Sequence, residues 1–549
     1  MNEVKNRNIW ETATAILLAG FSLMILFTFR DYGVSVDEKV ANENGRYFFD
    51  WFASGFHDRR VIDEGNQRLY GSAFNSISAF IADHSPLGVY DTDHLVIAIT
   101  SVIGLLFAYR LGKKLAGPMA GFFSVLLLLL TPVYYGHSFM NPKDIPFAAV
   151  FLASLYYFIA SYDRLPRPGA KLIVLLGVPI GLALGIRVGA VMLFGYGVVL
   201  IAFWIIARYR KSPSYRGAAI RRDLRPLFLS SLGVGAVAWL VMLLFWPYGQ
   251  LSPILNPLRA VRREAHFTDF EAKSLYQGRF IPSDSLPSDY LPTWFAITLP
   301  EFYGLILGIG LLTLIARKIA KGSPSDPDQQ SKMLFLVFAT CFPIVTAMVM
   351  RPILYDGNRH FLFVVPPLAV LTGVTLAWLL SGALPRALRI ATAAAVFVIG
   401  ALTAVDMVRL HPYEYIFFNR SFGGLRAALG RYETDYWGLS HKEGIDWLIA
   451  NYKPDAPKNS IRVANTAAEY QTSYYLRGND PRTARFTPVG QRDHPDVMLS
   501  ITRYDVHLKY PGKVLNVVER MGTPLLYVTE MATGQGPPTN GTQPVAGSR

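Results

Sequence analysis

The amino-acid sequence predicts a polytopic α-helical membrane protein with a small α/β domain in its C-terminal part. Its 549 residues are 52% hydrophobic and only 17% charged, a balance typical of chains that cross a bilayer several times. Apolar runs of about the length needed to span a bilayer recur from residue 9 to residue 408. Beyond them, short strand and helix signals alternate, as in a small α/β domain.

The membrane part is predicted to hold about eleven spans. The first run follows Lys5 and Arg7 but lacks the small-residue exit of a signal peptide, so we interpret it as a retained span. One short run, 171–186, is separated from the next by Arg187, which indicates a tight hairpin or a broken helix. The runs lie at about 9–29, 95–112, 117–135, 145–162, 171–186, 189–207, 227–247, 295–316, 333–350, 360–381 and 387–408.

Lysine and arginine residues predict which side of the membrane each connection faces. The net charge is +14, but many of these cations flank apolar runs and do not form the polar basic face that nucleic acid requires. With a cytoplasmic N-terminus, the inner connections are basic and the short outer turns are not, as topology signals require. The basic inner segments are Lys113-Lys114, Arg164 to Lys171, Arg208 to Arg225, Arg317 to Lys321 and Arg386 to Arg389.

The longest connections all fall on the predicted outer side. They are residues 30–94, residues 248–294 and the C-terminal tail. We divide the chain into a membrane domain (1–410), a small outer α/β domain (411–532) and a disordered Gly/Pro/Thr-rich end (533–549). Because loops on a rigid scaffold carry function, we expect the functional site on this outer side.

The first outer segment opens with two acids, Asp37 and Glu38, directly after the first span. Acids so close to a membrane are normally solvated or used, so Asp37 is a candidate catalytic acid/base with Glu38 as its neighbour. The alternative is that the pair only caps the next helix. That helix would carry the aromatic residues between Tyr47 and Phe56 at helical spacing, either in the membrane interface or packed on protein.

A second polar cluster occupies the short outer turn between the third and fourth spans. His137, Lys143 and Asp144 lie there within eight residues of one another. Asp144 is a second candidate catalytic acid, and Lys143 a candidate cation for an anionic group. The alternative is ordinary turn and helix-start chemistry, because Asn141-Pro142 and Asp144-Ile145-Pro146 are common in both.

Further cations lie at the predicted outer ends of two other spans. Arg359 and His360, in Tyr355-Asp356-Gly357-Asn358-Arg359-His360, open the tenth span and could clamp a phosphate. Arg359 could instead extend along the apolar surface to reach water. Arg187 has no partner visible in the sequence, which makes it a further candidate for phosphate binding.

An enzyme on the outer face has no supply of ATP or nucleotide-linked sugar, so an activated group must arrive there on a lipid. The chemistry then requires a carboxylate base, cations for a phosphate leaving group and an apolar groove for the lipid. The sequence has no H-E-x-x-H metal motif and no G-x-S-x-G nucleophile elbow. Two alternatives stay open: a transporter or flippase of a lipid-linked or anionic substrate, and a noncatalytic assembly partner.

Over residues 10–410 the order of these motifs resembles that of the GT-C glycosyltransferases. The resemblance is strongest to bacterial relatives of the protein O-mannosyltransferases and of the lipid A sugar transferases. It rests on Asp37-Glu38 in the first outer loop and on Asp144 between spans three and four. It rests also on Leu291 to Pro300 and on Tyr355 to Phe361.

The resemblance implies an inverting glycosyltransferase of a bacterial inner (plasma) membrane, with a periplasmic C-terminal domain. Its donor would be a polyprenyl-phosphate-linked sugar, and its acceptor a hydroxyl of lipid A, a glycan or a protein. Asp37 would be the base, and Asp144 would shape the donor or metal site. Family members differ in their need for a divalent metal ion, so the cofactor stays open. The residues expected to hold the donor phosphate are Arg359, His360, Arg187 and Lys143.

Overall fold

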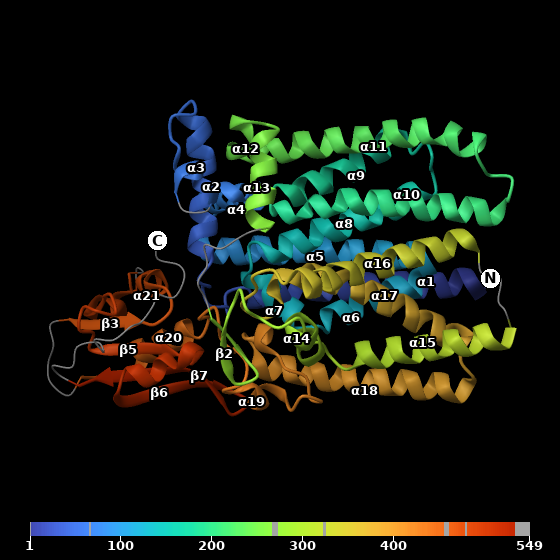
Figure 1. Ribbon diagram of the computed structural model, residues 1–549. Helices are drawn as coiled ribbons and strands as arrows, with labels where there is room; N and C mark the ends of the chain where they lie inside the picture. Colours follow the sequence, from blue (N-terminus) through green and yellow to red (C-terminus); the bar gives the residue numbers. More distant parts are fainter. Residues whose placement is uncertain are drawn as a thin grey trace.

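The computed structural model describes residues 2–64, 67–265, 273–321, 326–454, 460–477 and 480–532. It consists of a bundle of long helices and a five-stranded sheet that lies at one end of the bundle (Figure 1). The N-terminus lies at the opposite end of the bundle (Figure 1). The buried side chains of the bundle and of the sheet form one continuous hydrophobic cluster, so the two parts pack as one body.

Nine helices in the described part of the chain are long and apolar enough to cross a membrane. A tenth span is possible if α6 (Pro118–Leu129) and α7 (Pro132–Met140), which meet at 71°, count as one. The nine spans contain α1 (Asn2–Thr28), α5 (Val89–Ala116), α8 (Asp144–Tyr162), α10 (Met192–Lys211), α11 (Ala218–Leu244), α15 (Phe302–Lys321), α16 (Pro327–Met350), α17 (Val365–Trp378) and α18 (Arg386–Leu410). A shorter apolar helix, α9 (Gly169–Leu184), packs against α8 and α11.

The predicted multi-pass helical architecture is confirmed, and the count of eleven spans stays a prediction. Two predicted runs are divided. The run 117–135 breaks at Thr131, and the run 295–316 breaks at Leu299, between α14 (Tyr290–Thr298) and α15. Both residues precede a proline and have extended backbone angles, because the proline ring disfavours helical geometry in the residue before it.

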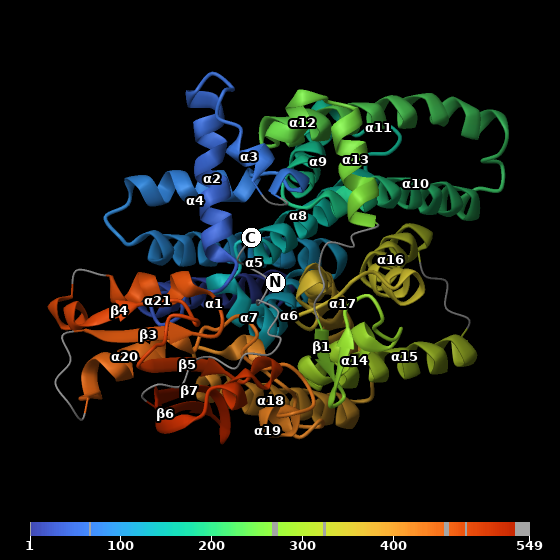
Figure 2. The same ribbon diagram turned by 60° about the vertical axis from the view of Figure 1, so that its left-hand side comes forward.

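The predicted outer segments fold at the end of the bundle that carries the sheet. Figures 1 and 2 both place α2, α3, α4, α12 and α13 there. Phe48 and Trp51 of α2 are buried, whereas Phe49 and Phe52 are exposed, so one face of α2 packs on protein and the other does not. These segments contain α2 (Glu38–Ala53), α3 (Arg60–Asp63), α4 (Ala73–His84), α12 (Pro247–Leu251), α13 (Leu255–Ala265), β1 (Lys273–Tyr276) and β2 (Arg279–Pro282).

The C-terminal part folds as the predicted small α/β unit. Its strands are ordered β4-β3-β5-β7-β6; β3 pairs in parallel with β4 and β5, and β7 pairs antiparallel with β5 and β6. The sequence did not predict β4, which has only three residues and ends in a proline. The elements are α20 (His441–Asn451), β3 (Ile461–Asn465), α21 (Glu469–Leu476), β4 (Phe486–Pro488), β5 (Val497–Ile501), β6 (Gly512–Arg520) and β7 (Thr523–Met531).

The segment between α18 and α20 joins the sheet to the bundle. It contains a 3₁₀ turn, Glu414–Ile416, and α19 (Gly424–Ala428), and its side chains Tyr415, Phe417 and Trp437 are buried. The domain boundaries near residues 410 and 532 stay predictions. The end predicted to be disordered, 533–549, lies outside the described residues.

Candidate active site

A cavity of about 820 Å³ lies where the first outer loop, the start of α8, the start of α10 and the turn before α17 come together. Its volume is in the range of sites for small organic ligands. Much of its wall is apolar, with Phe147, Val188, Phe342 and Phe361 among the lining residues. The polar lining residues are Asp37, Asn44, Tyr70, Asn75, Asn141, Lys143, Arg187, Glu264, Thr346, Arg351, Tyr355, Arg359 and His360.

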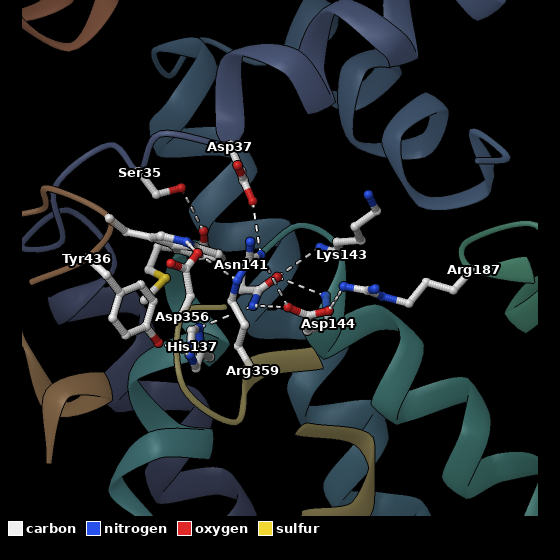
Figure 3. A network of polar contacts seen from close by, with 12 residues as sticks. Ser35, Asp37, His137, Asn141, Lys143, Asp144, Arg187, Asp356, Arg359 and Tyr436 are labelled. Atoms are coloured by element: carbon white, nitrogen blue, oxygen red, sulfur yellow. Dashed lines mark hydrogen bonds and ion pairs between the residues drawn. The ribbon is translucent and has the colours of Figure 1, made fainter. Parts of the chain in front are cut away.

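Asp37 belongs to a network of polar contacts that borders this cavity (Figure 3). It is the residue before α2, yet its side chain makes no capping hydrogen bond to that helix. The Asp37 side chain is 45% exposed, and its Oδ2 accepts a hydrogen bond of 3.1 Å from Nη1 of Arg359. The carboxylate therefore faces the cavity and a cation, and it does not serve as the helix cap that was the alternative interpretation.

The turn from Asn141 to Asp144 is held by its own side chains. Oδ1 of Asn141 accepts hydrogen bonds from the backbone N–H groups of Lys143 and Asp144, at 3.1 and 2.8 Å. Nδ2 of Asn141 donates to Oδ2 of Asp144 at 2.9 Å. Asp144 is the first residue of α8, where a carboxylate also complements the helix dipole. Arg187 forms an ion pair with its other oxygen, Oδ1.

Arg359 joins three aspartates. Its Nη1 lies 3.1 Å from Asp37 and 3.9 Å from Asp144, and its Nε lies 3.0 Å from Asp356. The Arg359 side chain is only 6% exposed, and its guanidinium packs against the ring of Trp437, 4.9 Å from the centroid. Charges this deeply desolvated interact strongly, so the positions of Asp37 and Asp144 are coupled through one cation.

Three further basic groups border the same cavity. Nζ of Lys143 lies 3.4 Å from the centroid of the Tyr70 ring, and burial together with the nearby Arg187 lowers the pKa of Lys143 to about 8. Arg187 lies between α9 and a 3₁₀ turn, Val188–Val191, that leads into α10. His360 lines the cavity with its ring edge-on to Tyr355, the two centroids 4.5 Å apart.

Glu38 is turned away from the cavity and is absent from its lining. Its buried carboxylate lies 2.9 Å from Nε2 of His94 and accepts a 3.0 Å hydrogen bond from the backbone N–H of Ser35. Burial raises the pKa of Glu38 to about 7. The structure thus places Glu38 behind the loop that carries Asp37, where it can orient that loop but cannot reach a ligand in the cavity.

Two acids near the cavity were not assigned a role from the sequence. Glu264, on α13, lines the cavity, and its Oε2 is buried without a hydrogen-bond partner. Asp356 lies inside the motif that opens the tenth predicted span and binds Arg359. The signal for Asp356 was its position before Gly357, because Asp-Gly pairs favour turns. Nothing in the sequence near Glu264 distinguishes it from a solvated acid.

Across the described ranges, no group of three or more His, Cys, Asp and Glu side chains is placed to hold a metal ion. The three aspartates of the network face guanidinium groups instead. Asp37 and Asp356 face Arg359, and Asp144 faces both Arg359 and Arg187. These residues do not fit a divalent cation in this arrangement, and no step below is assigned to one.

Residues 75–220 match the family model described as dolichyl-phosphate-mannose-protein mannosyltransferase. This stretch includes Lys143, Asp144 and Arg187 but neither Asp37 nor Arg359. None of the curated proteins compared with the sequence matches it.

Several solved structures are similar to this chain. ArnT from Cupriavidus metallidurans in the apo state is 14% identical, with a TM-score of 0.50, and the match covers 94% of this chain and 98% of that one. ArnT bound to undecaprenyl phosphate matches at 15% identity and 0.48, over 94% and 97%. The Archaeoglobus fulgidus oligosaccharyltransferase AglB, in complex with an inhibitory peptide and a dolichol-phosphate, matches at 12% and 0.49, over 90% and 70%. The predicted resemblance is confirmed as a likeness in fold to ArnT and as a family-model match over residues 75–220.

Proposed function

We propose that this multi-pass membrane protein is an inverting glycosyltransferase that moves a sugar from a polyprenyl-phosphate donor to an acceptor hydroxyl. One observation carries the proposal: an acidic side chain, Asp37, shares a largely apolar cavity of about 820 Å³ with cations that include Lys143, Arg187 and Arg359. Such a cavity offers a base, a phosphate site and a surface for a lipid chain. The fold and the family-model match over residues 75–220 support the same activity.

In the proposed reaction Asp37 is the general base. It accepts the proton of the acceptor hydroxyl while the acceptor oxygen forms a bond to the anomeric carbon of the sugar. The bond between that carbon and the phosphate oxygen breaks, and its electron pair leaves with the polyprenyl phosphate. Because attack and departure occur on opposite faces of the sugar ring, the configuration at the anomeric carbon inverts.

The cations supply the electrostatic part of the mechanism. Negative charge grows on the phosphate as it leaves, and fixed positive groups in a poorly solvated cavity stabilise that charge. The groups that would stabilise this charge are Lys143, Arg187 and Arg359, which line the cavity, and His360 can add a hydrogen bond to the phosphate. Phe147, Phe342 and Phe361 extend the cavity as an apolar surface for the first isoprene units.

The proposed site faces the periplasm of a bacterial inner membrane. The long segments predicted to be outside, and the sheet, lie together at one end of the bundle, with the N-terminus at the other (Figure 1). The positive-inside pattern of the connections then puts the N-terminus in the cytoplasm. The acceptor is proposed to reach Asp37 from the side of the C-terminal domain.

The test is the Asp37→Asn variant, assayed in detergent or liposomes with a panel of polyprenyl-phosphate sugars. Asparagine keeps the size of the side chain but cannot accept the proton, so transfer should fall by about a thousandfold or more. Asp50→Asn is the matched control: Asp50, also exposed to 45%, also binds an arginine, Arg60, at 2.8 Å, but lies at the far end of α2. It should transfer at the wild-type rate.

Near-normal turnover of Asp37→Asn would remove Asp37 from the mechanism. Flux of a lipid-linked substrate across the liposome membrane without any glycosidic product would replace the enzyme by the transporter or flippase. Inversion itself is read from the anomeric configuration of the product, and retention would contradict the single-displacement step.

A further inference from the structure

The C-terminal domain reaches into the active site through one side chain, Arg503. This residue begins a 3₁₀ segment, Arg503–Lys509, directly after β5, and its side chain is only 6% exposed. Its Nη2 lies 2.5 Å from Oδ1 of Asp356, and its Nη1 donates to the backbone carbonyl of Tyr436 at 2.9 Å. Its Nε lies 3.4 Å from a carboxylate oxygen of Glu433.

Asp356 is therefore shared between two guanidinium groups. Oδ1 faces Arg503, whereas Oδ2 lies 3.0 Å from Nε of Arg359 and accepts a hydrogen bond of 3.3 Å from Nε1 of Trp437. Asp356 has φ +56°, in the left-handed region that few residues other than glycine adopt. Such a conformation persists only where the surroundings hold it, and Arg503 and Trp437 are those surroundings.

We propose that Arg503 is a positioning residue that places Arg359 against the base Asp37. Two carboxylates, those of Asp356 and Asp37, compete for Arg359. With Oδ1 of Asp356 taken by Arg503, only Oδ2 is left for Nε of Arg359, so Nη1 of Arg359 points to Asp37 at 3.1 Å. Without Arg503, both oxygens of Asp356 are free to bind Arg359 in the bidentate geometry that arginine and carboxylate prefer.

This inference rests on the proposed function, since it assigns a role within the same reaction. Arg359 drawn towards Asp356 would leave both the base and the phosphate site misplaced. Misplacement on the scale of 1 Å lowers rates about a hundredfold. Arg503→Met should therefore lower kcat by about tenfold to a hundredfold and raise KM for the donor, because Arg359 no longer faces the phosphate.

The rise in KM separates positioning from loss of structure. A variant that is partly unfolded has less active enzyme, which lowers the apparent kcat but leaves KM unchanged. Arg503→Lys keeps a cation beside Asp356 and should restore part of the activity. In an Asp356→Asn background, Arg503→Met should add little, since the two residues act through one link.

Arg520 provides the matched control within the same domain. It lies on β6, pairs with Glu443 at 2.7 Å and packs over the Tyr413 ring, 4.8 Å from its centroid. Arg520→Met thus removes an arginine–carboxylate pair from the domain without touching Asp356 or Arg359. It should change the melting temperature but not KM for the donor.

The experiment measures kcat, donor KM and melting temperature for the full-length wild type, the two Arg503 variants, Asp356→Asn, the double variant and Arg520→Met. A wild type that transfers no sugar from any polyprenyl phosphate overturns the proposed function. A transferring wild type with Arg503→Met within twofold of it in both kcat and KM overturns the role of Arg503. If Arg503→Met does not fold, Arg503→Lys and Asp356→Asn decide: unchanged donor KM in both also overturns that role.

Discussion

The two turns that bring charge to the cavity are held in different ways. The turn 141–144 supports itself: Asn141 binds two backbone N–H groups and the Asp144 carboxylate within three residues. The turn 355–359 is held from outside, because Asp356 is fixed by Trp437 and Arg503, far along the chain. One side of the site is thus held locally, and the other depends on contacts with the C-terminal domain.

The loop that carries Asp37 is likewise held by residues of the C-terminal domain. Nε2 of Gln471, on α21, donates to the carbonyl of Val34 at 2.6 Å, and the backbone N–H of Val34 donates to the hydroxyl of Tyr475 at 2.8 Å. The backbone N–H of Val36 donates to the carbonyl of Trp437 at 3.3 Å. We therefore expect changes in the local turn to affect binding of the donor phosphate and changes in the contacts of the Asp37 loop to affect the base, whereas loss of Arg503, which acts through Arg359, should affect both.

Apart from the loss of the proposed base, Asp37, the largest effect should come from removing the charge of Asp144 at the end of the local turn. Asp144→Asn leaves Arg187 without its carboxylate partner and Arg359 with one fewer, and breaking a buried ion pair from one side costs about 3–5 kcal/mol. Both arginines would then shift, and transfer should fall more than about a hundredfold. The measurements are kcat/KM and the melting temperature in detergent.

Asp163 gives the control for that substitution. It lies just beyond the other end of α8, where it pairs with Lys114 at 2.7 Å and also with Lys332. Asp163→Asn removes an aspartate from the same helix without touching the cavity, so its kcat/KM should stay at the wild-type value. Equal losses in both variants would mean that α8 as a whole, and not Asp144, is what transfer needs.

A smaller loss, with a different kinetic signature, is expected from the remote contacts. Gln471→Ala removes the hydrogen bond to Val34 together with those to the carbonyls of Trp437 and Gly438 and the one from the Ala468 N–H, and losing a buried hydrogen bond costs about 1–3 kcal/mol. If about 1.4 kcal/mol of this reaches the transition state, kcat falls about tenfold. Donor KM should not change, since the phosphate cations are held elsewhere. Gln491→Ala, in the same domain, removes only a bond to Tyr510 and should leave both constants unchanged.

Asn141→Ala is the counterpart on the local side and sharpens the contrast. It removes the hydrogen bonds that fix Lys143 and Asp144, so the donor phosphate site loosens. Donor KM should rise about tenfold, corresponding to about 1.4 kcal/mol, with a smaller change in kcat. If Asn141→Ala and Gln471→Ala change kcat and donor KM in the same way, the phosphate site and the base are not supported separately.

The same difference explains what the sequence could predict. Asp37, Lys143, Asp144, Arg187 and Arg359 were identified because each polar residue stands beside an apolar run, which is a local signal. The helical body was predicted from apolar runs, and β3, β5, β6 and β7 from short β-like runs, which are local signals as well. The helix breaks at Thr131 and Leu299, each before a proline, are local signals too. They were missed because the apolar residues on both sides of each break were taken as one continuous span.

What could not be predicted depends on contacts between distant segments. Glu38 is next to Asp37 in the chain, but the α2 backbone turns its side chain towards His94 on α5. Arg503 follows a strand with no unusual sequence feature, and its proposed role depends on its contact with Asp356, 147 residues away in the chain. Glu264 lines the cavity because α13 folds back over it. A single sequence carries no signal for such pairs before the fold is known.

The smallest effect is a pH dependence of donor binding that should belong to the local side alone. The pKa of Lys143 is lowered to about 8, so this side chain loses its positive charge as the pH rises through that value. The donor phosphodiester keeps its single negative charge over the same range. Donor KM should therefore be constant below about pH 7 and rise several-fold by pH 9, as the ammonium form of the free enzyme disappears.

Lys143→Arg tests the assignment, because a guanidinium stays charged throughout this range. Its donor KM should be flat with pH, although larger than the wild-type value at pH 7, since the planar guanidinium does not reproduce the position of the compact lysine ammonium. Gln471→Ala should keep the wild-type pH profile, because its defect lies on the other side of the site. A rise in KM that persists in Lys143→Arg would assign the titration to another group and leave Lys143 without a role in binding the phosphate.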